Sequence, residues 1–300
     1  MVSVNDAPAE SKPETESNKA ARKRLRKQPP PDPAPLAGLI DAHTHLAACG
    51  GRDPETVRAI VDRAAAVGVE AVVTVADDIV DARWAHQAAH WDERVYAAVA
   101  LHPTHAGELD DAARAELETM AGDDRVVAVG ETGLDYYWIG KSESCATKEQ
   151  QYEAFAWHID LAKRLRKPLM IHNRDADADL LDVLAAEGSP ETVIMHCFSG
   201  DRNVARECID RGYVLSFSGT VTFANSGELR AAAELVPDNQ LLVETDAPFL
   251  TPHPYRGQPN QSYCLPYTAR DIARTRGVGE DELAAILGAN ARRIYGIPLR

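Results

Sequence analysis

Short runs of β-forming residues alternate with helical stretches from residue 39 onward, and this alternation constrains the fold more than any other feature of the chain. Eight runs have strand character, namely residues 39–43, 70–75, 95–100, 126–130, 168–172, 192–196, 213–217 and 241–245. Strands that are each followed by a helix favour a parallel sheet, and eight such units are the number that closes a (β/α)8 barrel.

The segments between the runs have apolar residues at helical spacing, as in PETVRAIVDRAAAVG (54–68) and EQQYEAFAWHIDLAKRLRK (149–167). An open doubly wound sheet is the alternative arrangement of the same elements. Its dinucleotide-binding version loses support because no G-x-G-x-x-G follows the first run. We therefore predict an α/β protein built as a TIM-type (β/α)8 barrel.

Residues 1–36 differ in composition from the rest of the chain. They are polar, poor in aliphatic residues and rich in proline near QPPPDPAPL (28–36), so they bury too little apolar surface to become ordered. We predict a disordered N-terminal tail over residues 1–36 and a single barrel domain over residues 37–300. Six basic residues between Lys19 and Lys27 form either a solvated arm or a contact for nucleic acid or acidic partners.

The charge balance limits the partners of the barrel. The chain has a net charge of −14, with 45% hydrophobic and 26% charged residues, as in a globular protein with a sizeable core. Residues 1–38 hold seven basic and five acidic residues, so the remainder carries −16. This balance excludes a broad basic surface for nucleic acid, and no apolar run approaches the roughly 20 residues of a membrane-spanning helix.

The cysteines favour a reducing compartment. Their number, five, is odd, no C-x-x-C pair is present, and the polar N-terminus lacks the apolar region of a secretory signal. We expect a cytoplasmic protein whose cysteines are small apolar residues, namely Cys49, Cys145, Cys197, Cys208 and Cys264.

Histidines and carboxylates gather at the ends of five of the eight runs. The sequences there are DAHTH (41–45), GETGLD (130–135), IHNR (171–174), MHCFSG (195–200) and ETDAP (244–248). In a (β/α)8 barrel the carboxyl ends of all strands share one rim, where active sites lie. Residues far apart in the sequence are therefore expected to meet in one site.

Four histidines and two carboxylates of this set suit two divalent ions. Because His43 and His45 are two residues apart in an extended segment, their side chains share a face and can bind one ion. We assign His43, His45 and Asp246 to one ion and His172 and His196 to the other, with Glu131 as the bridge. Imidazole suits zinc and carboxylate oxygen suits magnesium or manganese, so the set does not select one metal.

Taken singly, each of these residues has an ordinary explanation. An H-x-H pair occurs by chance, a carboxylate such as Glu131 can cap a helix, and His172 can be a core histidine. Five strand ends together are much harder to explain in this way. Two divalent ions give the centre a charge of +2, which attracts a phosphodiester, while the acidic barrel favours ends and single strands over long duplexes.

Six motifs occur in order between residues 39 and 297, namely DAHTHL, VGETGLDYY, PLMIHNRDA, HCFSG, ETDAPFLTPHPYRG and NARRIYG. With these motifs the chain resembles the TatD-type metal-dependent deoxyribonucleases of the amidohydrolase superfamily. The resemblance implies a TIM-type barrel and a two-metal hydrolase with 3′→5′ exonuclease activity on DNA, at single-stranded or 3′ ends, and also on RNA. It implies Mg²⁺ or Mn²⁺ in catalysis and places metal ligands at the same six positions.

Further roles follow at the same rim. Asp246 is the candidate general base, with Glu131 as the second catalytic residue. Arg174 can hold a phosphate oxygen as a forked donor, or can form a salt bridge at the rim. His102 is a candidate donor to substrate, and Ser199 either binds an anion or caps the following helix.

One loop departs from the family pattern. The family often has Arg-Gly-Lys-x-Asn-Glu after the last strand, whereas this chain has glutamine at Gln258 and Gln261. The exchange removes two charges and affects the expected phosphate contacts and substrate preference, but not the six ligands.

Two other functions use some of the same features. A related ester or amide hydrolase, such as a deacylase acting on aminoacyl-tRNA, would use the same activated water. Glu131 favours the nuclease over amide hydrolysis because it stands where other amidohydrolases carry a carbamylated lysine. A non-catalytic nucleic-acid-binding module would use the basic tail and would not need six ligands. No protein partner follows from the sequence.

Overall fold

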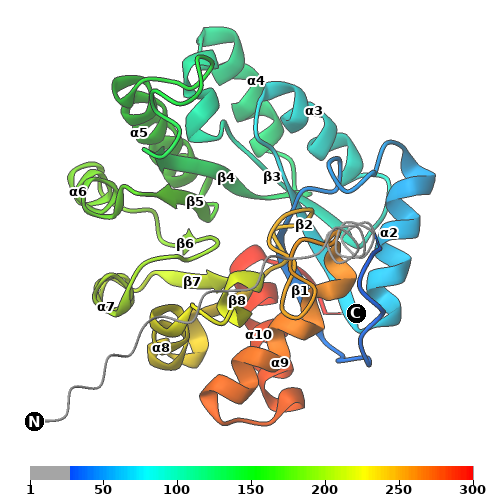
Figure 1. Cartoon of the computed structure of the whole chain (residues 1–300). Helices are drawn as coiled ribbons and strands as arrows, with labels where there is room; N and C mark the ends of the chain where they lie inside the picture. Colours follow the sequence, from blue (N-terminus) through cyan, green and yellow to red (C-terminus); the bar gives the residue numbers. More distant parts are fainter. Residues whose placement is uncertain (1–27, 300) are drawn as a thin grey trace, which may run out of the picture.

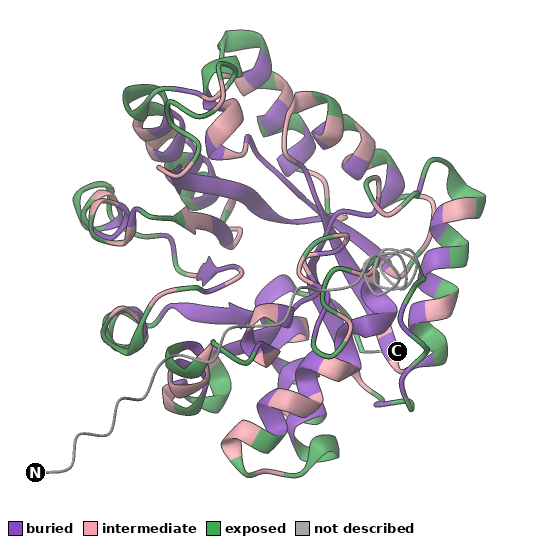
Figure 2. Cartoon of the chain, in the orientation of Figure 1, coloured by how far each residue is buried: buried purple, intermediate pink, exposed green. Residues whose placement is uncertain are grey.

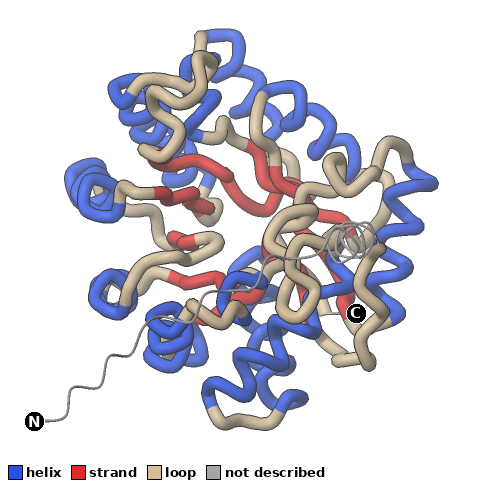
Figure 3. Tube along the Cα trace, in the orientation of Figure 1, coloured by secondary structure: helices blue, strands red, loops and turns tan. Residues whose placement is uncertain are grey.

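The computed structural model describes residues 28–299 and has the expected (β/α)8 architecture. Eight parallel strands form one sheet in the order β1 to β8, and helices surround it on the outside (Figures 1 and 3). The strands are β1 (Leu39–Thr44), β2 (Val69–Val75), β3 (Val95–Val99), β4 (Val126–Asp135), β5 (Leu169–Arg174), β6 (Val193–Met195), β7 (Val214–Phe217) and β8 (Leu241–Val243). The predicted fold class is confirmed.

The helices follow the strands in turn. They are α2 (Pro54–Ala66), α3 (Ile79–Ala88), α4 (Asp111–Ala121), α5 (Lys148–Leu165), α6 (Asp177–Glu187), α7 (Arg202–Asp210), α8 (Gly227–Leu235), α9 (Leu265–Arg276) and α10 (Glu280–Tyr295), with short 3₁₀ helices η1 (Pro103–Glu108), η2 (Gly219–Thr222), η3 (Asp238–Gln240) and η4 (Ser262–Cys264). Capping residues determine where several helices begin. Asp53, the N-cap of α2, accepts a hydrogen bond from Thr56 N (2.8 Å). Within residues 28–299, no helix is both long and apolar enough to cross a membrane.

All eight strands differ in length from the predicted runs, seven of them by only one or two residues, and the changes in β4 and β8 bear on the site. The prediction ended one strand at residue 130, whereas β4 continues to Asp135 because Thr132 to Asp135 stay paired with β5. The prediction ended the last strand at residue 245, whereas β8 ends at Val243, and Asp246 has a left-handed backbone with φ 52°. Both changes affect segments that carry predicted site residues.

The sheet separates two apolar cores, because successive side chains of a strand point to opposite faces. The inner core fills the barrel and includes Ile40, Ala42, Val73, Ala98, Met170, Ile194 and Leu242. The outer core lies between strands and helices and includes Leu39, Val57 and Phe155. Figure 2 shows the strands as largely buried and the helices as buried mainly on the side facing the sheet. The barrel is therefore filled by side chains rather than being an open pore.

The last strand returns to the first at the carboxyl end of the barrel. Thr44 and Ala247 form a parallel bridge there. His45 N donates to Ala247 O (2.7 Å), and Asp246 N donates to His43 O (3.0 Å). These backbone bonds hold the segments after β1 and β8 side by side.

A buried carboxylate strengthens this closure. Asp41 of β1 accepts hydrogen bonds from Thr245 N (2.8 Å) and from Thr245 Oγ1 (2.6 Å). Burial raises the pKa of Asp41 to about 7, although the bonds from Thr245 oppose this shift. Asp41 therefore joins the two strand ends through its side chain and does not need to belong to the ligand set.

The C-terminal helix α10 packs across the amino end of the barrel. Its residues Ile294 and Tyr295 belong to the inner core, and Tyr295 Oη donates to Ala42 O (3.0 Å). Gly288 of α10 lies against the chain just before β1, where an added Cβ would be 2.0 Å from Gly38 O. Close contact with the backbone therefore requires glycine at this position.

Part of the predicted tail lies against the barrel. Residues 28–36 are described, and Leu36 is buried. Tyr263 Oη donates to Pro30 O (2.8 Å), and Arg63 pairs with Asp32 (2.8 Å). The structure therefore differs from the prediction for these residues, because the proline-rich segment finds donors and apolar surface on the barrel. The remainder of the predicted tail, including Lys19 to Lys27, lies outside the described residues.

The Gly288 contact predicts the effect of a single methyl group. We expect Gly288→Ala to lower the free energy of unfolding by about 1–3 kcal/mol, because neither the Gly38 carbonyl nor the helix backbone can move freely. Gly227→Ala is the matched control, since a Cβ at Gly227 meets nothing within 4 Å. Thermal or denaturant unfolding of both variants measures the difference, and equal stabilities would contradict this packing.

Candidate metal centre

The six residues predicted as metal ligands meet at the carboxyl rim of the barrel. They come from β1 and the residue after it, from β4 and β5, and from the segments after β6 and β8, in the order His43, His45, Glu131, His172, His196 and Asp246. Four of them are buried, while His172 and Asp246 are half-buried, and all except His43 line one cavity of about 580 Å³. The structure therefore brings the whole predicted set into one place.

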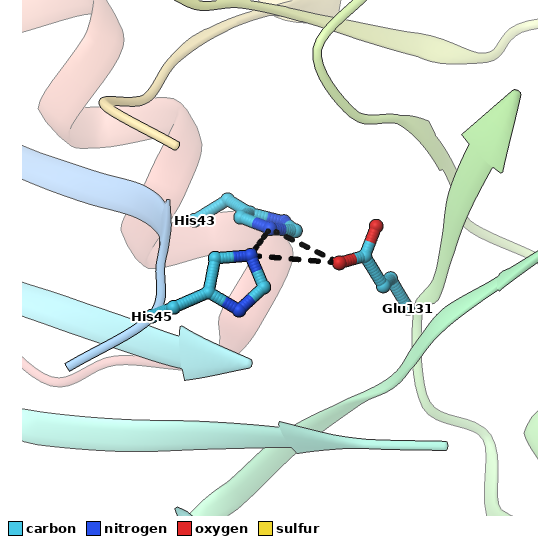
Figure 4. Close-up of side chains that lie close together, drawn as sticks. All are labelled: His43, His45 and Glu131. Atoms are coloured by element: carbon cyan, nitrogen blue, oxygen red, sulfur yellow. Dashed lines mark hydrogen bonds and ion pairs between the residues drawn. The ribbon is translucent and has the colours of Figure 1, made fainter. Parts of the chain in front are cut away.

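One group of atoms surrounds Glu131 Oε1. The Nε2 atoms of His43 and His45 lie 3.2 Å apart, and each is 3.6 Å from Glu131 Oε1 (Figure 4). Asp246 Oδ1 is 3.6 Å from His43 Nε2 and 3.5 Å from His45 Nε2. Ligands bound to one ion at about 2.0–2.2 Å are separated by distances of this order, so these four residues fit a divalent ion.

A second group surrounds the other oxygen of the same carboxylate. His172 Nδ1 lies 3.2 Å and His196 Nε2 lies 2.9 Å from Glu131 Oε2. Glu131 is only 3% exposed, and among the described residues its Oε2 has these two imidazole contacts but no hydrogen bond of good geometry. Buried polar atoms normally have a well-aligned partner, and a divalent ion bound by Oε2 and the two imidazoles would supply one.

Close pairing of β4 with β5 fixes the place of Glu131. Gly133 of β4 is opposite His172 of β5, and it has φ 138°. A Cβ at Gly133 would lie 2.1 Å from His172 O, so only glycine allows the two strands to approach in this way. The glycine of the motif thus lets Glu131 and His172 face each other.

Three further carboxylates lie near the imidazole nitrogens that point away from Glu131. His172 Nε2 lies 3.0 Å from Asp135 Oδ2, and His196 Nδ1 lies 3.1 Å from Glu244 Oε1. On the other side of the centre, His45 Nδ1 lies 3.6 Å from Asp77 Oδ1. Partners of this kind fix the ring orientation and the tautomer of a metal-binding histidine.

Sequence reasoning assigned no role to these three carboxylates. Asp135 and Glu244 lie within the GETGLD and ETDAP motifs, whereas Asp77 follows β2, whose carboxyl end belongs to none of the motifs. Their position at the carboxyl ends of strands is the feature that could have indicated them, as it did for the proposed metal ligands. Position alone does not show which carboxylate reaches which imidazole.

The buried Glu131 carboxylate sets the pKa values around it. Burial favours its neutral form, but the nearby imidazoles of His196 and His43 hold the pKa of Glu131 well below its usual value. Burial also lowers the pKa of His45, yet the adjacent Asp246 and Glu131 outweigh it and raise this pKa to about 9. With protein groups alone the centre therefore retains protons on imidazole, and divalent ions must displace them on binding.

The predicted substrate contacts line the same cavity but differ in their surroundings. Arg174 has its guanidinium 3.8 Å from the Tyr137 ring centroid, with no carboxylate partner among the described residues, so the alternative of a salt bridge is not observed. His102 Nδ1 lies 2.6 Å from Thr104 Oγ1, and its ring is edge-on to His172. Both side chains therefore face the space next to the centre.

Ser199 is exposed and lines the cavity, but it does not cap the following helix. The N-cap of α7 is Asp201, whose carboxylate accepts hydrogen bonds from Asn203 N (2.8 Å) and Val204 N (3.0 Å). The helix begins three residues after Ser199 because aspartate at this position satisfies the free N–H groups. The alternative of Ser199 as an N-cap was therefore wrong.

The two glutamines that depart from the family pattern lie away from this cavity. Gln261 Nε2 donates to Cys49 O (3.3 Å), and neither Gln258 nor Gln261 is part of the cavity lining. The five cysteines are free, and none belongs to a group of possible metal ligands in the described chain.

Comparisons with known proteins agree with this site. The profile of the family described as TatD related DNase matches residues 40–296. A metal-dependent hydrolase TatD of Mycobacterium tuberculosis, described as uncharacterized, is 63% identical over 259 residues that cover 86% of this chain and 98% of that protein. A Cronobacter sakazakii protein named 3′-5′ ssDNA/RNA exonuclease TatD is 33% identical over 243 residues, covering 79% and 90%.

A solved structure has the same architecture. The crystal structure of YJJV, a TatD homolog from Escherichia coli K12, superimposes with a TM-score of 0.78 at 28% identity, covering 88% of this chain and 100% of that chain. A (β/α)8 barrel with histidines and carboxylates gathered at its carboxyl rim defines a metal-dependent hydrolase. Within that class, this chain belongs to the TatD family.

The contact between His196 and Glu244 predicts a measurable effect on metal binding. We expect Glu244→Ala to weaken divalent-metal affinity about 10–100-fold, because His196 loses the partner that orients its ring. Titration of each variant with Mn²⁺ or Zn²⁺ measures the effect.

The control uses a histidine pair that lies outside the cavity. His86 of α3 and His90, just after this helix, both lie 3.1 Å from Asp123 Oδ2, and Asp123 precedes the amino end of β4, away from the carboxyl rim. The double variant His86→Ala/His90→Ala should keep the wild-type affinity for the divalent metal at the rim. Unchanged affinity in Glu244→Ala would contradict the supporting role of this carboxylate.

Proposed function

We propose that this chain is a two-metal phosphodiesterase that removes nucleotides from the 3′ ends of single-stranded DNA, and also of RNA. The observation that carries this proposal is the geometry of Glu131. Its Oε1 faces His43 and His45, whose Nε2 atoms also face Asp246, while its Oε2 faces His172 and His196. A single buried carboxylate between two sets of ligands suits a pair of ions.

The composition of the set supports the choice of metal. Imidazole and carboxylate together accept Mg²⁺ or Mn²⁺ for catalysis, and they also accept Zn²⁺. When bound, such ions stabilise the charge that develops on phosphate oxygens and make water a better nucleophile. The proteins that this chain resembles are described as metal-dependent hydrolases, and one is named an ssDNA/RNA exonuclease.

Asp246 is the residue that we assign as the general base. Its side chain is 13% exposed and lines the cavity, so one carboxylate oxygen can face a water while Oδ1 faces the two imidazoles. The left-handed backbone at Asp246 and its N–H bond to His43 O keep the carboxylate at the rim. We infer that Asp246 orients the attacking water and accepts its proton.

The surrounding side chains are suited to an anionic substrate. Arg174 lines the cavity and has no carboxylate partner within residues 28–299, so its guanidinium can donate to a phosphate oxygen. His102 and Ser199 add an imidazole and a hydroxyl to the same lining. The barrel carries a large negative charge, and this favours short or single-stranded substrates over long duplexes.

An exonuclease assay tests this proposal. We expect the purified chain to shorten a 5′-labelled single-stranded oligonucleotide from its 3′ end with Mg²⁺ or Mn²⁺, and EDTA to abolish the reaction. Glu131→Ala should reduce the rate by more than the roughly 10–100-fold that loss of a supporting partner causes. Glu153→Ala is the matched control, because that glutamate is exposed on α5, pairs with Arg114 and is not part of the cavity lining.

The assay also distinguishes the alternatives. Full activity of Glu131→Ala would show that the cleavage comes from another site or a contaminant. Absence of cleavage by the wild type with a fully loaded centre would reject the nuclease and leave ester hydrolysis on aminoacyl-tRNA as the next substrate to test.

A further inference from the structure

Two exposed aromatic rings line the cavity that contains the metal centre. Trp138, in the loop between β4 and α5, is 40% exposed, and Phe249, after β8, is 55% exposed. Five large hydrophobic side chains are exposed among the described residues, and only these two belong to the cavity lining. Rings of this size are normally buried, so their exposure at a functional cavity needs a reason.

Phe249 is adjacent to the metal ligands themselves. Its ring lies 5.9 Å from the His45 ring, centroid to centroid, at an interplanar angle of 74°. This edge-on contact holds one part of Phe249 against the centre, while more than half of the side chain stays accessible. A flat group bound against Phe249 would therefore lie next to the proposed reacting phosphate.

Two positively charged side chains, Arg174 and Lys141, lie near Trp138 and its neighbour Tyr137. The Arg174 guanidinium lies 3.8 Å from the Tyr137 ring centroid and 5.9 Å from that of Trp138. Lys141 Nζ lies 3.4 Å from the same Tyr137 centroid. Neither cation has a carboxylate partner in the part of the chain that the structure describes, although the barrel is rich in acidic residues. Two free cations next to an exposed ring suit a ligand with both phosphate and aromatic groups.

Trp138 also borders a second, smaller hollow. This cavity, of about 230 Å³, is lined by Thr104, His105, Trp138, Ser142, Ser144 and Cys145. Three of these residues, Thr104, His105 and Trp138, also line the larger cavity. The two spaces are therefore neighbours, and the smaller one offers hydroxyl and imidazole groups beside the indole ring.

We propose that Trp138 and Phe249 are stacking faces for the nucleobases of a single-stranded substrate, with Arg174 and Lys141 contacting its backbone. This inference rests on the proposed nuclease function and names the feature of the substrate that the site recognises. Bases of a single strand are free to stack on protein rings, whereas those of a duplex are already stacked on one another. Stacking does not depend on base identity, so the site tolerates sequence while it selects unpaired strands.

Comparison of a normal strand with an abasic strand tests this inference. We expect the wild type to prefer an oligothymidylate over an abasic oligomer of equal length by about 100-fold in kcat/KM, because only the first has bases to stack on the two rings. Trp138→Ala and Phe249→Ala should each reduce this preference by about tenfold, while Trp138→Phe, which keeps a ring, should largely retain it. Val80→Ala is the control, because Val80 is an exposed apolar residue outside both cavities.

A binding measurement keeps this test separate from catalysis. Fluorescence anisotropy in an Asp246→Asn background compares the affinity of the same two oligomers without turnover. Tighter binding of the base-bearing strand, lost in Trp138→Ala, supports stacking even if the wild type cleaves neither oligomer, an outcome that would reject only the proposed nuclease function. Cleavage or binding that treats both oligomers alike, or a preference that survives both alanine substitutions, would overturn the stacking inference and leave the nuclease function intact.

Discussion

The structure of the site depends on one buried carboxylate that faces imidazoles on two sides. Glu131 is almost completely buried, and a charge in such a place is costly unless opposite charges or strong hydrogen bonds compensate it. Four histidines provide that compensation, and the resulting pKa shifts run in opposite directions on the carboxylate and on His45 and His196. The proposed pair of divalent ions would take over this compensation by displacing the imidazole protons on binding.

The barrel supplies the geometry that this interaction needs. The bridge between Thr44 and Ala247 joins the segments after β1 and β8, and so places His43 and His45 beside Asp246. On the opposite side, Gly133 allows β4 and β5 to approach until Glu131 and His172 meet. Five of the eight strands, or the segments directly after them, therefore bring the proposed ligands from distant parts of the chain together around one carboxylate. The loops beyond the strands contribute the groups that we assign to substrate.

Much of this arrangement could be predicted from the sequence because it follows from periodicity and strand ends. All eight predicted strands overlap observed strands, and the six proposed ligands lie at one rim. The pairing of Asp77, Asp135 and Glu244 with particular imidazoles could not be predicted, since it depends on strand register and on side-chain direction. The same holds for Trp138 and Phe249, because a sequence does not show whether an aromatic residue of a loop is buried. Packing of residues 28–36 was missed because their composition is that of a disordered segment.

The central claim is that Glu131 joins two ions, and electron paramagnetic resonance of the Mn²⁺-loaded chain tests it most directly. Two Mn²⁺ ions that share a carboxylate are about 4 Å apart and interact magnetically, so the account predicts two ions per chain and the spectrum of a coupled pair. Glu131→Gln should bind fewer ions or give the spectrum of isolated Mn²⁺. A single bound ion in the wild type, or two uncoupled ions whose spectrum Glu131→Gln leaves unchanged, would contradict the account.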